Sequence, residues 1–455
     1  MTKENRWPDC SGVHNASVSP LSAKDAAFFY PWFHGSPSST DQHLVYAFAW
    51  PENGGSRTDA VRDQFARRYH LAPFFHRRLE RVPGDLGHPL VRVDPTFDPA
   101  RVVGRRVDSW RDALSAVGDI VRVPLDVRRH LWEVTVLDGF TDGPEGTTML
   151  VVVHASHSLC AGFGLSLSVQ TVLFDGDLPV PDLPDPDVRS RRRAALRGLA
   201  RIPADVARSA RAAIAFRRHG DVDPPRTTTP LIYTAVPHRD RAVEILAVDG
   251  AGVADPLSRT LSAISSAMAD HAHVHGDANA RAALAAYVTL VLPPSIPWSS
   301  TNRFVSAAIP FHADVEDTVE RARAIRASVS ETRKRMFTPE YLARYEVVEE
   351  LPPAVVSRLI RRGVRRPQAD GPVGGHTVVS SAVRPATALG GIGHAYRFST
   401  GFPMLTPGIV LTHSVAVIGE HVTIGVLADP GVLPDFAGYV ARLRDAVRRD
   451  VGHIH

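Results

Sequence analysis

The sequence predicts an α/β protein with two domains, and three observations support this prediction. The chain has 455 residues, more than one hydrophobic core usually organises. Valine-rich runs typical of buried strands alternate with segments at helical spacing, as in Met149 to Val153 and then Leu165 to Leu173. The proline- and aspartate-rich segment 175–186 marks a boundary. We therefore expect an N-terminal half at residues 1–180, a linker at 181–228 and a C-terminal half at 229–455.

Composition restricts the class of protein. Hydrophobic residues make up 44% and charged residues 22% of the chain, as in ordinary globular proteins. No apolar run reaches the roughly 18 residues of a membrane span, and the first residues contain no apolar signal core. Cys10 and Cys160 lie far apart and fit a reducing compartment. We therefore expect a cytoplasmic protein, and its arginine-dominated basic composition suggests a bacterial source.

Elements of the first half follow from local patterns. Ser22 and Asp25 have the spacing of a capping box, which predicts a helix start. Aromatic and branched residues predict strands, and helical spacing predicts a helix over Val61 to His70. The expected strands are Leu44 to Trp50, Leu90 to Val93, Leu131 to Gly139 and Met149 to Val153.

A histidine-bearing turn follows the Met149 to Val153 strand. Residues 154–162 are mostly small and carry His154 and His157, and a helical pattern resumes after Gly162. A buried strand that ends in such a turn places an imidazole at the edge of a core. There it can be held rigidly and still reach a ligand.

The linker contains a strongly basic segment. Ten arginines lie between Arg189 and Arg218, and Asp205 is the single acid among them. Apolar residues recur near helical spacing, which predicts an amphipathic segment that Pro203 divides into two helices. One interpretation of this segment is a solvated linker helix that lies against both halves. The other is that its positive charge attracts it to an anionic membrane surface, at the inner membrane face, or to coenzyme A phosphates.

The second half repeats the alternation of strands and helices. Asp255 and Pro256 predict the start of a helix through Ala269. Further helices are expected at Thr318 to Arg333 and Phe436 to Val447. The expected strands and buried elements are Leu231 to Val236, Val243 to Val248, Ala282 to Leu292, Phe304 to Ile309, Thr377 to Pro385, Ile409 to Ala416 and Thr423 to Ala428.

Several short motifs occur in one order along the chain. They are P-L-S-x-x-D-A-A-F from Pro20, P-F-F-x-x-R-L from Pro73, D-P-T-F-D from Asp94 and L-W-E-V from Leu131. Together they resemble the bacterial wax ester synthase/diacylglycerol acyltransferase family, within the chloramphenicol-acetyltransferase-like and condensation superfamily. The resemblance covers roughly Ser19 to Val447. It implies two chloramphenicol-acetyltransferase-like halves, each a mixed sheet flanked by helices, which meet along a central tunnel.

The resemblance also implies an acyltransferase activity. The segment Ser156 to Gly162 resembles the family signature H-H-x-x-x-D-G, with Ser156 at the first histidine and Ala161 at the aspartate. We expect His157 to be the general base that takes a proton from a hydroxyl or amine acceptor. The co-substrate would be acyl-CoA or an acyl carrier protein, with no tightly bound cofactor.

Other family positions are altered too. Ser381 stands where the strand motif S-N-V-P-G-P has asparagine, and Asn302 matches a glycine-asparagine step. We expect Ser381 and Asn302 to contact the oxyanion or the substrate. Gly162, His154 and Ser156 are expected to support the turn.

Competing interpretations remain open from the sequence. His154 is either a second functional imidazole or a satisfied core residue, and Cys160 is either a nucleophile or a small buried hydrophobe. No metal site is expected, and nucleic acid is not favoured, because basic and aromatic residues are not interleaved. The altered motif leaves two alternatives to an active O-acyltransferase. One is a non-catalytic lipid- or acyl-carrier-binding protein, and the other a condensation-type acyltransferase in specialised-metabolite assembly.

Overall fold

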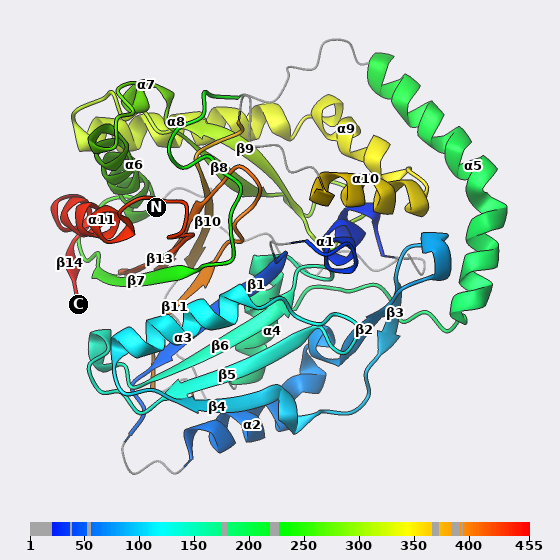
Figure 1. Ribbon diagram of the computed structural model, residues 1–455, viewed down its shortest axis with the longest axis horizontal. Coiled ribbons are helices and arrows are strands. Elements are labelled where there is room, and N and C mark those ends of the chain that lie inside the picture. Colours follow the sequence, from blue (N-terminus) through cyan, green and yellow to red (C-terminus); the bar gives the residue numbers. More distant parts are fainter. Residues whose placement is uncertain are drawn as a thin grey trace.

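A computed structural model describes residues 21–455 except 37–38, 52–55, 175–177, 179, 219–226, 366–372, 385–391 and 393–394. Its helices surround two large mixed sheets (Figure 1). The helices are α1 Ala23–Phe33, α2 Arg57–Arg68, α3 Trp110–Arg122, α4 Gly162–Leu173, α5 Arg191–Arg218, α6 Pro256–Val274, α7 Ala280–Ala283, α8 Thr318–Met336, α9 Pro339–Glu349, α10 Pro353–Arg365 and α11 Phe436–Asp450.

The first large sheet has five strands in the order β11-β1-β6-β5-β4. Its strands are β1 Asp41–Phe48, β4 Val102–Arg106, β5 Trp132–Asp138, β6 Met149–Ser156 and β11 Tyr396–Phe402. Only the β4–β5 pair is parallel among these described strands. A separate antiparallel pair joins β2 Arg77–Glu80 to β3 Leu90–Val93.

The second large sheet has seven strands in the order β14-β7-β13-β12-β10-β8-β9. In it β10 runs parallel to both β12 and β8, and the remaining described pairs are antiparallel. Its strands are β7 Ala242–Asp249, β8 Ala285–Val291, β9 Phe304–Pro310, β10 Thr377–Arg384, β12 Leu411–Ile418, β13 His421–Ala428 and β14 His453–Ile454. The two mixed sheets with flanking helices confirm the fold class that the resemblance implied.

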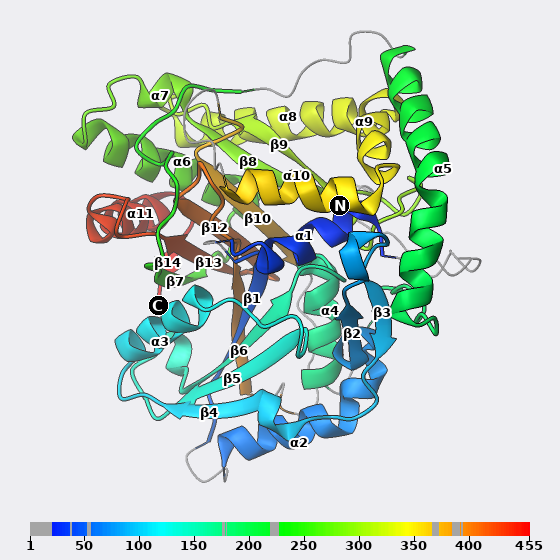
Figure 2. The same cartoon turned by 45° about the vertical axis from the view of Figure 1, so that its right-hand side comes forward.

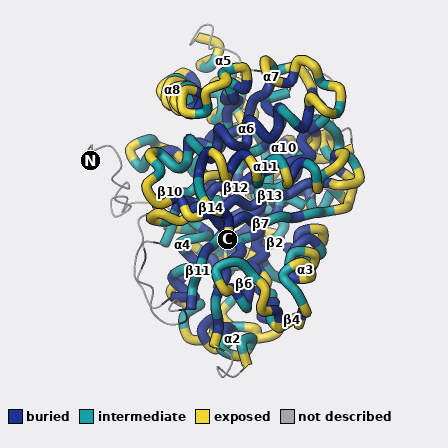
Figure 3. Tube along the Cα trace, turned by 90° about the vertical axis from the view of Figure 1, so that its left-hand side faces the viewer, coloured by how far each residue is buried: buried dark blue, intermediate teal, exposed yellow. Residues whose placement is uncertain are grey.

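The valine run of β6 is apolar throughout because both faces of the first sheet are covered. Val151 and Val153 pack into the core that α2 and α4 share. Leu150 and Val152 face the core that α3 shares with β7 of the second sheet. Figure 3 shows that the strands are mostly buried, whereas α2 and α8 carry exposed residues.

Strand β11 connects the two sheets. It follows β10 in the chain, yet it pairs antiparallel with β1, with Ser399 opposite Tyr46. On its other side, the Thr400 hydroxyl lies 2.7 Å from that of Ser414 on β12. One strand of the second half therefore completes the sheet of the first half. The expected boundaries at residues 180 and 228 stay a prediction.

Helix α5 lies along the outer edge of the molecule in two views (Figures 1 and 2). Near its start, Arg191 pairs with Glu80 of β2 at 3.3 Å. Further along, Arg208 pairs with Glu350, just after α9, at 2.9 Å. The helix therefore contacts both halves. Its exposed large apolar side chains are Leu196, Leu199, Val206 and Ile214.

Two sequence predictions are wrong. Pro203 does not divide the basic segment, because α5 continues through it. Proline removes the hydrogen bond to the carbonyl of Leu199, and Leu199 is an exposed residue of this helix. The segment Leu231 to Val236 is not a strand. The Thr234 N–H donates to the Leu231 carbonyl at 2.8 Å, which closes a turn. No helix within the described residues combines the length and apolar character needed to cross a membrane.

Candidate active site

A cavity of about 1500 Å³ lies between the two large sheets. Its lining comes from β1, the turn after β6, the start of α4, and strands β8 to β12 of the second half. Apolar side chains such as Leu44, Leu167 and Val378 share this lining with histidine, serine and arginine side chains. The cavity can therefore hold an extended apolar molecule with a few polar groups.

His157 lies on the wall of this cavity, one residue after β6 ends. Its ring stacks on Phe28 of α1, with centroids 4.1 Å apart and planes 13° apart. Phe304, at the start of β9, contacts the same ring at 5.8 Å. The imidazole is thus held between aromatic rings from both halves of the chain.

A buried polar network fixes the backbone at His157. The Asn302 side-chain amide donates to the His157 carbonyl at 2.9 Å and to a carboxylate oxygen of Asp25 at 2.6 Å. The same carboxylate accepts from the Ser300 hydroxyl at 2.5 Å and from the Thr301 N–H at 3.0 Å. Asp25 therefore joins the start of α1 to the loop that supports the histidine turn.

Burial keeps the His157 imidazole neutral. It lowers the pKa of His157 to about 4, and the residue's own backbone and the Asn302 side chain offset this only partly. Neither group is placed to hydrogen-bond Nδ1, which is buried and has no partner among the described residues. Nε2 is therefore the nitrogen through which the ring can meet a molecule in the cavity. A neutral imidazole there can accept a proton.

The rest of the altered motif holds the turn by other bonds. The Ser156 hydroxyl lies 2.9 Å from that of Ser158. The Gln42 side chain donates to the Cys160 carbonyl at 2.6 Å, and a Cβ at Gly162 would come within 3.3 Å of its Oε1. Ala161 precedes α4 without a side-chain cap. Packing and hydrogen bonds between neutral groups therefore hold this turn, in which Ala161 stands at the aspartate position of the family motif.

Cys160 is poorly suited to nucleophilic chemistry. Its thiol is buried, and burial raises the pKa of that thiol well above its ordinary value. Because the thiolate is the reactive species, this cysteine behaves as a small core residue.

His154 forms a buried pair with Asp41, at 2.9 Å between Nε2 and Oδ2. Its ring stacks on His43 at 4.4 Å. Burial raises the pKa of Asp41, but hydrogen bonds from His154, the Leu125 N–H and Ser39 outweigh it and hold the pKa below its ordinary value. His154 thus has a hydrogen-bond partner within the core, while Asp41 and His43 line the cavity.

The two expected oxyanion contacts differ in position. Ser381 lines the cavity on β10 and is exposed there. Asn302 is 4% exposed, and its amide is used by Asp25 and the His157 carbonyl. Ser381 is therefore open to a ligand, whereas Asn302 holds the turn. The catalytic roles expected from the sequence stay predictions.

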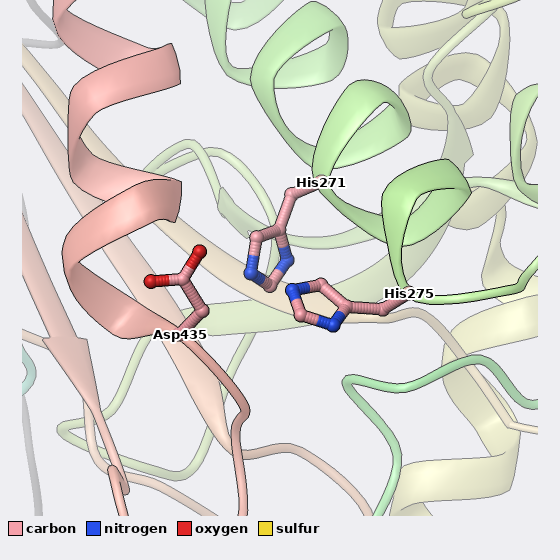
Figure 4. Close-up of side chains that lie close together, drawn as sticks. All are labelled: His271, His275 and Asp435. Atoms are coloured by element: carbon pink, nitrogen blue, oxygen red, sulfur yellow. The ribbon is translucent and has the colours of Figure 1, made fainter.

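One side-chain cluster away from the cavity has metal-ligating groups. His271, His275 and Asp435 each offer a ligand atom within 4.8 Å of the others (Figure 4). Both ring nitrogens of His271 already have protein partners, the Pro434 carbonyl at 3.0 Å and the Tyr233 hydroxyl at 3.1 Å. His271 therefore acts as a structural residue that ties α6 to the segment just before α11.

Sequence reasoning missed Asp25 and Phe28 as site residues. Both lie in the P-L-S-x-x-D-A-A-F segment, which contributed to the resemblance, but Asp25 was interpreted only as a helix cap. The cap exists, since the Ser22 hydroxyl accepts from the Asp25 N–H at 3.0 Å. The available signal for a second role was a carboxylate followed directly by the apolar run Ala26 to Phe29.

The two mixed sheets, with a cavity between them, have a chloramphenicol-acetyltransferase-like fold. The solved structure of the wax ester synthase/diacylglycerol acyltransferase from Marinobacter aquaeolei VT8 shares this fold. Its TM-score is 0.59 at 16% identity, over 94% of this chain and 98% of that chain.

Within that class the chain belongs to the wax ester synthase/diacylglycerol acyltransferase family. The sequence model of the family's catalytic domain matches residues 21–308, and that of its C-terminal domain matches residues 300–449. A Mycobacterium tuberculosis H37Rv protein named for diacylglycerol O-acyltransferase activity, Rv0221, is 26% identical over 82% of this chain and 86% of its own. A second such protein, Rv3087, is 24% identical over 70% and 71%.

Proposed function

We propose that this protein transfers an acyl group from a coenzyme A or carrier-protein thioester to a hydroxyl acceptor. The observation that carries the proposal is the position of His157, neutral and fixed on the wall of an apolar cavity. Membership of an acyltransferase family supports the same reaction.

In the proposed reaction, the acceptor oxygen attacks the thioester carbonyl while Nε2 of His157 takes the hydroxyl proton. The tetrahedral intermediate then expels the thiolate, and the protonated imidazole returns the proton to the sulfur. Ser381, exposed to the cavity, would donate a hydrogen bond to the oxyanion. Thiolate is a good leaving group, so no covalent enzyme intermediate is needed.

The test is release of free thiol from acyl-CoAs of several chain lengths, with alcohol and diacylglycerol acceptors. His157→Ala should abolish acceptor-dependent release. His273→Ala changes an exposed histidine on α6 and is the matched control. Turnover retained in the His157 variant would refute the mechanism.

One observation favours the alternative of a binding protein without catalysis. Nδ1 of His157 has no acceptor among the described residues, whereas catalytic histidines are usually oriented through their second nitrogen. This alternative predicts acyl-CoA binding without thiol release, unchanged by His157→Ala.

A further inference from the structure

Arg384 is a cation on the cavity wall, and the described residues give it no anionic partner. It is the last residue of β10 and lines the cavity. Within the part of the chain that the structure describes, its buried Nε has no hydrogen-bond partner, and no carboxylate forms an ion pair with it. The guanidinium lies over the Phe163 ring, 5.4 Å from the centroid.

Neighbouring hydroxyl groups offer this guanidinium no counter-charge. Burial lowers the pKa of Arg384, and Tyr46 and Tyr396 only partly counter this effect. The Tyr46 hydroxyl lies 3.2 Å from that of Ser166, and the Tyr396 hydroxyl donates to Ser399. Both tyrosine hydroxyls are neutral groups, and among the described residues neither is hydrogen-bonded to Arg384. A guanidinium remains charged in proteins, so burial without a counter-charge has a large free-energy cost.

The surroundings of Arg384 reinforce its positive potential. Phe163 is the second residue of α4, and Ala161 gives this helix no side-chain cap. Residues 161–164 line the cavity, so the positive end of the helix dipole faces the same space.

We propose that Arg384 binds a carboxylate or phosphate group at one end of an otherwise apolar substrate. A planar guanidinium matches both groups through paired N–H donors. The apolar lining of the cavity accommodates the remaining chain. The role of this anionic amphiphile as a substrate rests on the proposed acyl transfer, but the anion site itself can be tested by binding.

The experiment compares three probes of equal chain length below their aggregation concentrations: dodecanoate, dodecyl phosphate and dodecan-1-ol. Calorimetry on the full chain should show one of the two anions binding at least about tenfold tighter than the alcohol. The anion that binds more tightly identifies the group that Arg384 recognises as a carboxylate or a phosphate. Arg384→Met should remove the preference and leave dodecan-1-ol affinity unchanged.

Two further variants make the result decisive. Arg384→Lys keeps the charge and should retain part of the preference, which excludes a folding defect as the cause. Arg344→Met changes another cavity arginine, one that lies over Tyr341 at 4.2 Å, and should keep the full preference. Equal binding of all probes by the wild type, or a preference that survives Arg384→Met, would overturn the inference. If the wild type prefers the anion but releases no thiol from acyl-CoA, the anion site at Arg384 stands and the proposed acyl transfer is refuted.

Discussion

Asp25→Ala should destabilise the protein strongly, because one buried carboxylate accepts several hydrogen bonds across the two halves. Its side chain accepts from Ser300, Thr301 and both the backbone and amide nitrogens of Asn302. At about 1.5 kcal/mol for each bond, the lower end of the range for bonds to a charged group, four bonds sum to about 6 kcal/mol. Ser300 can keep its own bond to the Asn302 N–H at 3.0 Å. We therefore expect a loss of about 3 kcal/mol in the free energy of unfolding, since such contributions are not additive.

The assay is urea unfolding at neutral pH, followed by far-UV circular dichroism and tryptophan fluorescence. Asp112→Ala is the matched control, because Asp112 occupies the same position of a capping box with Ser109 but is exposed. Its loss should cost about 1 kcal/mol or less. A difference between the two variants below about 1 kcal/mol would refute the reasoning that Asp25 joins the halves.

Three further predictions concern titration, reactivity and surface charge. Because burial lowers the pKa of His157 to about 4, the neutral base persists above that value. The acid limb of the pH profile of kcat/KM should therefore lie near pH 4. Circular dichroism checks that the protein stays folded over this range, and an acid limb near pH 6.5 would contradict the prediction. Alkylation of Cys160 by iodoacetamide at about pH 8 should be at least about 100-fold slower in the folded protein than in urea, and comparable rates by mass spectrometry would contradict its burial. Replacing Arg192, Arg193 and Arg197 with Gln should weaken binding to phosphatidylglycerol vesicles at least about tenfold at physiological salt, at about 1 kcal/mol per charge; unchanged cosedimentation would refute the expected membrane contact.

Local chemistry made the strand and helix starts predictable. The Met149 to Val153 run forms the first five residues of β6 because continuous apolar residues suit a strand covered on both faces. Asp255 caps α6 by accepting from the Ser258 N–H at 3.3 Å, as expected from an Asp-Pro step. Such signals act within a few residues of the chain and can therefore be read from the sequence.

Contacts between distant segments were not predictable in this way. The sequence places His157 after a buried strand, but Phe28, Asn302 and Phe304 reach it only through the fold. Arg384 similarly meets Phe163 across the cavity. Propensity and spacing carry no information about such pairs, because each residue alone is compatible with many environments.

The pairing of β11 with β1 has a consequence during synthesis on the ribosome. About 350 residues separate Phe48 from Tyr396, so at about 5–20 residues per second translation takes roughly 20–70 s to cover that distance. Until then one edge of β1, a strand that is almost wholly buried in the folded protein, stays unpaired, and such edges recruit other chains. The nascent protein therefore needs protection from aggregation until β11 has emerged, because its first sheet is complete only then.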